Sequence, residues 1–152
     1  MYFVSYRLQE VQEVNVQEVN VINLEAKILF FPSNHYLLFQ KAQKNNDNKQ
    51  LQHLVSGNER KGRDIFKHNI SFIPTNYYDS HWLAIVVLNA KNLLESEHKP
   101  TYILQLDSLY NKEFETVINV VIEWLKIEAK HRGVNFNKKR IHIIVPKGMC
   151  TY

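Results

Sequence analysis

A histidine and an aspartate stand at the ends of two apolar segments that have the composition of buried β-strands. His81 opens the run His-Trp-Leu-Ala-Ile-Val-Val-Leu, and Asp107 closes the run Thr-Tyr-Ile-Leu-Gln-Leu-Asp. If these strands pair as antiparallel neighbours, the start of the first and the end of the second lie at one edge of the sheet. A histidine and a carboxylate held together in this way are the base and the orienting group of a nucleophilic triad.

The segment after the second strand predicts where a third group would lie. Apolar residues with helical spacing predict a helix over residues 112–132, with Trp124 in its core and Glu128 on its polar margin. An apolar strand follows at residues 141–145 and stops at Pro146. A strand–helix–strand unit places its two strands parallel, so both end at the same edge. The topology therefore predicts a three-part site formed by His81, Asp107 and the segment after Pro146.

The first half of the chain gives weaker signals. Residues 33–43 have the spacing of a short amphipathic helix that begins near Pro32. The polar, asparagine-rich residues 44–62 predict an exposed, mobile loop, and residues 70–73 predict a strand that ends at Pro74. Before them, Val-Gln-Glu-Val-Asn occurs twice in tandem. We therefore predict a repeat-containing N-terminal segment over residues 1–23, outside a domain that spans residues 24–152.

Composition narrows the class of protein. The 152 residues are enough for one domain. The formal charge of +4 favours a partner with an acidic surface, but the sequence lacks the basic stripe that is typical of a nucleic-acid binder. A single cysteine excludes an internal disulfide framework and favours an intracellular protein. The sequence has no apolar run long enough to span a membrane and no signal-peptide pattern. Its seven histidines lack metal-ligand spacing, so no metal is expected.

The order of these motifs resembles the Ulp/SENP family of cysteine proteases, which process SUMO and related ubiquitin-like proteins. Residues 64–74 are similar to the family's "DIF…FIP" strand motif, and residues 81–83 resemble its catalytic-histidine motif. Residues 104–109, Leu-Gln-Leu-Asp-Ser-Leu, resemble its catalytic-aspartate motif, and Val-Pro at 145–146 is similar to the approach to its cysteine. The resemblance covers about residues 63–146.

The resemblance implies an α+β fold of the papain-like cysteine protease type, with a small mixed sheet flanked by helices and incomplete at both ends. It implies hydrolysis of the peptide or isopeptide bond after a modifier's C-terminal glycine. His81 would move the proton, and Asp107 would orient the imidazole of His81. Trp82 would bind substrate beside them, although its residue type alone predicts a core position. The implied partners are SUMO-like proteins and their conjugates, the implied location is the nucleus, and no cofactor is required.

The nucleophile departs from the family pattern. Family members carry a glutamine after Val-Pro and then Asp-Cys-Gly at the start of a helix, whereas this chain reads Lys-Gly-Met-Cys-Thr-Tyr after Pro146. Cys150 is thus a doubtful nucleophile, and we expect this chain to be a poor protease. Two alternatives stay open: a non-catalytic module that binds SUMO-like proteins, and a basic scaffold or nucleic-acid adaptor.

Overall fold

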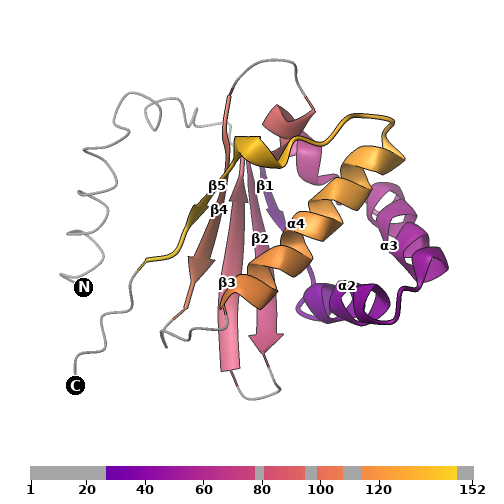
Figure 1. The fold of residues 1–152 in the computed structure, drawn as a ribbon, viewed down its shortest axis with the longest axis horizontal. Coiled ribbons are helices and arrows are strands. Elements are labelled where there is room, and N and C mark those ends of the chain that lie inside the picture. Colours follow the sequence, from indigo (N-terminus) through magenta and orange to yellow (C-terminus); the bar gives the residue numbers. More distant parts are fainter. Residues whose placement is uncertain (1–26, 78–80, 95–98, 108–113, 147–152) are drawn as a thin grey trace.

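The computed structural model describes residues 27–77, 81–94, 99–107 and 114–146, which form one sheet and a layer of helices. The repeat-containing segment at residues 1–23 lies outside the described residues. The five strands occur in the order β1-β2-β3-β4-β5 across the sheet. The strands are β1 (Ile28–Phe30), β2 (Ile70–Tyr77), β3 (His81–Leu88), β4 (Thr101–Leu106) and β5 (Ile141–Ile144), and the α-helices are α2 (His35–Lys44), α3 (Asn48–Arg60) and α4 (Phe114–His131). These helices lie on one side of the sheet (Figure 1).

The sheet is mixed. Strands β2, β3 and β4 are consecutive antiparallel neighbours, whereas β1 is parallel to β2 and β5 is parallel to β4. The predicted antiparallel pair of β3 with β4 and the predicted parallel pair of β4 with β5 are both confirmed. The α+β class predicted from the sequence is confirmed as well.

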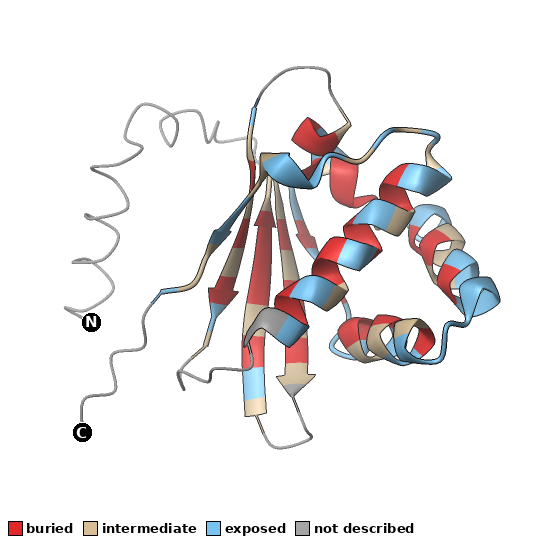
Figure 2. Cartoon of the chain, viewed as in Figure 1, coloured by how far each residue is buried: buried red, intermediate tan, exposed pale blue. Residues whose placement is uncertain are grey.

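One face of the sheet forms the core with the helices. Alternate residues of the central strands are fully or almost fully buried against the helical layer, among them Ile73, Ile85 and Ile103, each with 0% of its surface exposed. Helix α4 contributes an apolar stripe to the same core, and Figure 2 shows its buried residues on the side that faces the sheet. The predicted helices at residues 33–43 and 112–132 are confirmed over their described parts. Trp124 is a core residue, as predicted.

Helix α3 corrects the loop predicted at residues 44–62. The Asp47 carboxylate caps the helix by accepting a hydrogen bond from the Gln50 N–H at 2.9 Å. Leu51 and Val55 are one turn apart and are both buried against the other helices. The asparagine-rich composition concealed this pattern, because only a narrow stripe of the helix is buried. A capping carboxylate and an apolar pair at i and i+4 are sufficient once the helix has a surface to pack on.

Strand β2 also continues past Pro74, where the sequence predicted its end. The Phe31 N–H donates to the Phe72 carbonyl at 2.9 Å, so the main-chain groups of residue 72, and by alternation of Pro74, face the β1 side. Strand β1 pairs only with residues 70–72. The N–H that proline lacks would therefore point to a side where β1 has already ended, and pairing of Pro74 with Ala84 of β3 is kept.

Candidate active site

The sheet register brings His81 and Asp107 together. His81 is the first residue of β3, and Asp107 directly follows β4, whose residue Leu106 pairs with Ala84. The His81 Nε2 atom lies 2.5 Å from the Asp107 Oδ1 atom. This is the contact that the antiparallel pairing of the two strands predicted. The catalytic roles assigned to the two side chains stay predictions.

The contact fixes which ring nitrogen could do chemistry. A carboxylate only accepts hydrogen bonds, so Nε2 of His81 is the donor, and in a neutral ring Nδ1 then carries the lone pair. The imidazole is 18% exposed and the Asp107 side chain is 8% exposed. The imidazole is therefore accessible from outside, while the carboxylate lies in a less hydrated position.

The other two predicted site residues have different outcomes. Trp82 is 56% exposed, so it is not the core residue that its type suggested. Because side chains alternate along a strand, it lies on the opposite face of β3 from His81. Its role in substrate binding stays a prediction. Cys150 lies outside the described residues.

A buried polar cluster that the sequence analysis missed joins the three helices. Glu128 of α4 was expected on the polar margin, but it is 2% exposed, and its Oε1 atom accepts hydrogen bonds from Trp124 Nε1 at 2.9 Å and Asn58 Nδ2 at 3.2 Å. Asn58 Nδ2 also lies 3.4 Å from Nε2 of His35, which is 4% exposed. The available signal was the three-residue step from Leu125 to Glu128, which places both on the buried stripe of α4.

Burial shifts the acid–base behaviour of this cluster. Loss of solvation, helped by the positive charge of Arg63, lowers the pKa of His35 to about 3. Loss of solvation raises the pKa of Glu128, although the hydrogen bonds from Trp124 and Asn58 act in the opposite direction. The cluster lies in the helical core, and its contacts tie α2, α3 and α4 together.

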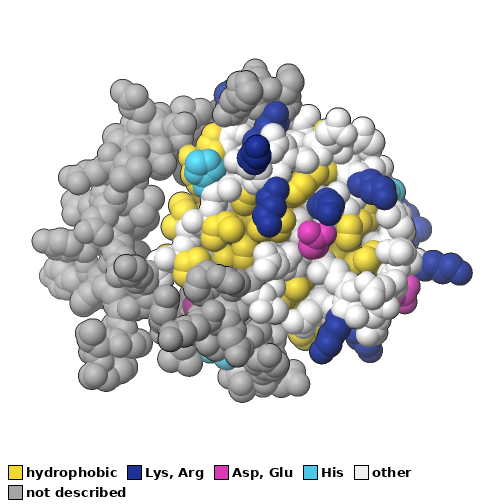
Figure 3. Space-filling model, in the orientation of Figure 1, with side chains coloured by type: hydrophobic (Ala, Val, Ile, Leu, Met, Phe, Trp, Pro, Cys, Tyr) yellow, Lys and Arg dark blue, Asp and Glu magenta, His cyan; other side chains and the backbone are white. Residues whose placement is uncertain are grey.

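The described residues offer little for other chemistry. Over that part of the chain, no group of three His, Cys, Asp or Glu side chains is arranged to hold a metal ion. No helix within the same residues has the length and apolar character needed to cross a membrane. Figure 3 shows Lys and Arg side chains scattered over the helical side with uncharged surface between them, which differs from a continuous basic stripe.

Comparison with known proteins identifies a matching family and several solved structures with a similar fold. The model of the Ulp1 protease family, C-terminal catalytic domain, matches residues 3–149. No curated protein matches the chain. Among solved structures, a de-sumoylating protease is 18% identical with a TM-score of 0.63, and the match covers 97% of this chain and 51% of that one.

Two further structures give the same picture. The SUMO protease Ulp1 with its catalytic cysteine oxidised to a sulfinic acid is 18% identical, with a TM-score of 0.55 and coverage of 82% of this chain and 50% of that one. The C-terminal Ulp1 protease domain in complex with Smt3, the yeast ortholog of SUMO, is 18% identical, with a TM-score of 0.53 and coverage of 83% and 51%. The chain thus spans about half the length of these structures. At this identity the likeness shows a shared fold.

Proposed function

Because the chain belongs to the Ulp1 protease family, we propose that His81 and Asp107 are the base and the orienting carboxylate of a cysteine peptidase site that acts on ubiquitin-like modifiers. The observation that carries this proposal is the contact between His81 Nε2 and Asp107 Oδ1. It supplies two of the three groups of a nucleophilic triad, with the second nitrogen of the ring left to meet the nucleophile.

The chemistry follows from that ring orientation. Nδ1 of His81 takes the proton of a thiol, and the thiolate attacks the carbonyl carbon of the modifier's C-terminal glycine. The imidazolium, stabilised by Asp107, then gives its proton to the departing amine as the C–N bond breaks. Water, deprotonated by His81, hydrolyses the thioester and frees the modifier's carboxylate and the thiol.

The proposed partners are SUMO or related ubiquitin-like proteins, and the proposed location is the nucleus. Support for the partner comes from the family match and from a similar fold that was solved in complex with Smt3. Trp82 gives the modifier an exposed aromatic contact beside the histidine. We expect Trp82→Ala to weaken SUMO binding about tenfold or more in calorimetry, a loss typical of an exposed aromatic anchor. Leu38→Ala, an exposed apolar side chain on α2, is the matched control and should leave the affinity unchanged.

The dyad can be tested without any nucleophile. In proton NMR of the folded chain, the His81 Nε2 proton should give a downfield signal that is protected from solvent exchange by its bond to Asp107. This signal should disappear in Asp107→Ala, while the ring of His53 on α3, which is exposed, serves as the unprotected reference. A His81 ring proton that exchanges as fast as that of His53 would contradict the dyad.

A second candidate function is a non-catalytic module that binds SUMO-like proteins. The observation that favours it is the context of Cys150, where Lys-Gly-Met precedes the cysteine in place of the family's Asp-Cys-Gly. We expect the 152-residue chain to bind SUMO in calorimetry but to form no covalent adduct with a SUMO-derived thiol-reactive probe. An adduct that is lost in both Cys150→Ala and His81→Ala would identify Cys150 as the nucleophile and exclude the non-catalytic function.

A further inference from the structure

The face of the sheet opposite the helices is apolar over its whole width. Strand alternation and register place one side chain of each strand in a row that crosses all five strands. We call the sheet surface centred on this row the open face. Its central row consists of Phe30, Phe72, Val86, Leu104 and Ile144.

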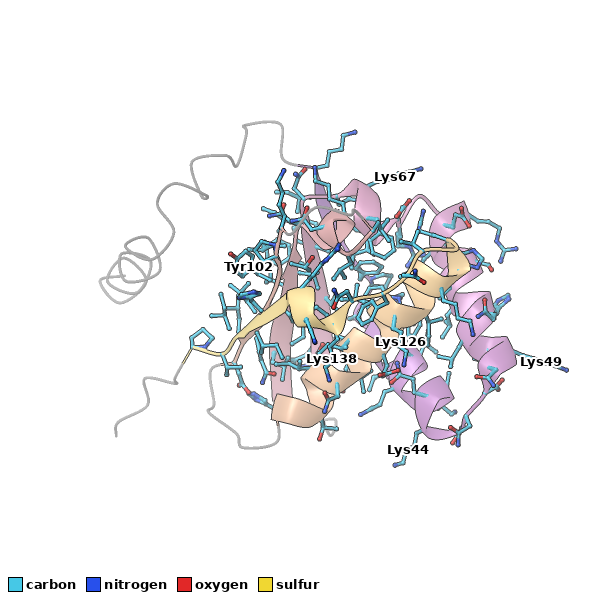
Figure 4. The ribbon with its side chains drawn as sticks, turned by 45° about the horizontal axis from the view of Figure 1, so that its top comes forward. Lys44, Lys49, Lys67, Tyr102, Lys126 and Lys138 are labelled. Atoms are coloured by element: carbon cyan, nitrogen blue, oxygen red, sulfur yellow. The ribbon has the colours of Figure 1, made fainter. Side chains whose placement is uncertain are left out.

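The open face has two flanking rows of the same character. One contains Ile28, Ile70, Leu88, Tyr102 and His142, and the other contains Pro74, Ala84 and Leu106. None of these positions carries Lys, Arg, Asp or Glu, in a chain of which 22% of the residues are charged. Figure 4 shows Tyr102 on this side of the sheet, whereas Lys44, Lys49 and Lys126 belong to the helical layer.

Of these thirteen side chains, four are exposed, Val86 is buried and the others are half-buried; the exposed ones are Ile28, Phe30, Leu106 and His142. Phe30 is 66% exposed, Ile28 is 49% exposed and Leu106 is 44% exposed, even though the Phe30 and Phe72 rings stack on each other at a centroid distance of 5.0 Å. The described helices all pack on the opposite side (Figure 1). Large apolar side chains in one continuous patch are typical of a surface that is buried in the functional protein.

Strand β3 points to the same conclusion from its sequence. It reads Leu-Ala-Ile-Val-Val-Leu from Leu83 to Leu88, without the polar alternation of a strand that faces water on one side. Continuous apolar runs are the pattern of strands that are covered on both faces. The helices cover one face of β3, so its sequence predicts that a second layer covers the open face.

We propose that a second copy of this chain provides that layer, with the two open faces packed against each other about a two-fold axis. A symmetric contact needs a self-complementary surface, and a face without charged side chains meets its own copy without like-charge repulsion. The contact is a sheet-on-sheet sandwich with the layers about 10 Å apart. This dimer is independent of the peptidase chemistry proposed above.

The size of the face corresponds to a small dimer contact. Five strands at about 4.8 Å each and about six residues at roughly 3.3 Å each give a projected area of roughly 480 Å². Two copies would bury roughly twice this area, or about 960 Å², which is close to the roughly 1,000 Å² lower limit of a specific interface. Trp82 lies on the same face, one row beyond Pro74 and Ala84, at the rim of this contact.

The test is the mass of the full chain in solution. Light scattering coupled to size-exclusion chromatography should give twice the chain mass at micromolar concentration. Phe30→Lys places one charge from each copy in the contact, and we expect it to raise the dimer dissociation constant by about 100-fold or more. Leu38→Lys makes the same charge change on helix α2, at a side chain that is 40% exposed, and should leave the dimer intact. Ile28→Lys repeats the test if the Phe30 variant does not fold, as judged by circular dichroism.

Two outcomes overturn the proposal. One is a monomer across the micromolar range, in which case the open face takes another occupant, such as additional polypeptide of the kind present in the longer solved structures. The other is a dimer that is dissociated by Leu38→Lys but not by the substitutions on the open face, which would place the contact on the helical layer.

Discussion

Burial of His35 makes the stability of this protein fall in mild acid by an amount that can be calculated. The imidazole has a pKa of about 3 in the folded chain, against 6.5 as its ordinary value. A lowered pKa means that the unfolded chain binds the proton more readily than the folded one. Stability from this group is therefore complete above pH 6.5 and is lost as the pH falls toward 3.

The magnitude follows from the two pKa values. At pH 5.0 the unfolded histidine is almost fully protonated and the folded one is almost fully neutral, so proton binding favours the unfolded chain. The cost is about 1.5 pK units of free energy, or about 2 kcal/mol relative to pH 7.5. The His35 ring lies near Asn58 and Trp124, and its pKa is also lowered by the charge of Arg63. The pKa of the neighbouring Glu128 is raised, so its contribution to stability changes with pH in the opposite direction. The prediction therefore concerns a difference between variants.

The assay compares urea unfolding at pH 7.5 and pH 5.0 for the parent chain and for His35→Gln. Glutamine offers Asn58 a polar partner but does not titrate. We expect the parent to lose about 2 kcal/mol more than the variant over this interval. His53→Gln, the same change on the exposed side of α3, should behave like the parent. Equal pH dependence in the parent and in His35→Gln would refute the argument that burial keeps His35 neutral.

Four other substitutions test a helix cap, the core packing and the buried carboxyl. Asp47→Ala removes the cap of α3 and should cost about 1 kcal/mol in urea unfolding, because the Gln50 N–H loses its acceptor. Ile103→Ala empties a fully buried position and should cost about 2–5 kcal/mol, whereas Ile143→Ala, at a position 48% exposed, should stay within about 0.5 kcal/mol of the parent. Glu128→Gln should gain stability relative to the parent as the pH rises above 4.5 in pH-dependent unfolding, because a raised folded pKa means that ionisation of the buried carboxyl destabilises the folded chain.

Strong periodicity made the second half of the chain predictable. Local patterns predict whether each element is a helix or a strand in β3, β4, α4 and β5. The rules of strand connection then fix the relative directions of the strands. The contact of His81 with Asp107 followed from those directions alone. The contact between these two residues could thus be predicted without knowledge of the first half of the chain.

The parts that could not be predicted depend on contacts distant in sequence. Helix α3 is stable because α2 and α4 accept its narrow apolar stripe, and a local reading of residues 44–62 sees only polar composition. Pro74 is tolerated because β1 has already ended on that side of β2, which depends on a strand about forty residues earlier. Glu128 is buried because Asn58 and Trp124 supply donors.

The order of strands in the sheet also has a consequence for how the chain folds. Strands β2, β3 and β4 are sequential neighbours, whereas β1 pairs with β2 across residues 31–69 and β5 pairs with β4 across residues 107–140. Closing the longer loops costs more chain entropy, so we expect the central three strands to pair first. Kinetic measurements should then show that truncating Ile85 slows folding, while truncating Ile141 mainly speeds unfolding, and the reverse pattern would contradict this order. His81 begins β3 and Asp107 directly follows β4, so we expect these two side chains to come together before the edges of the sheet are complete.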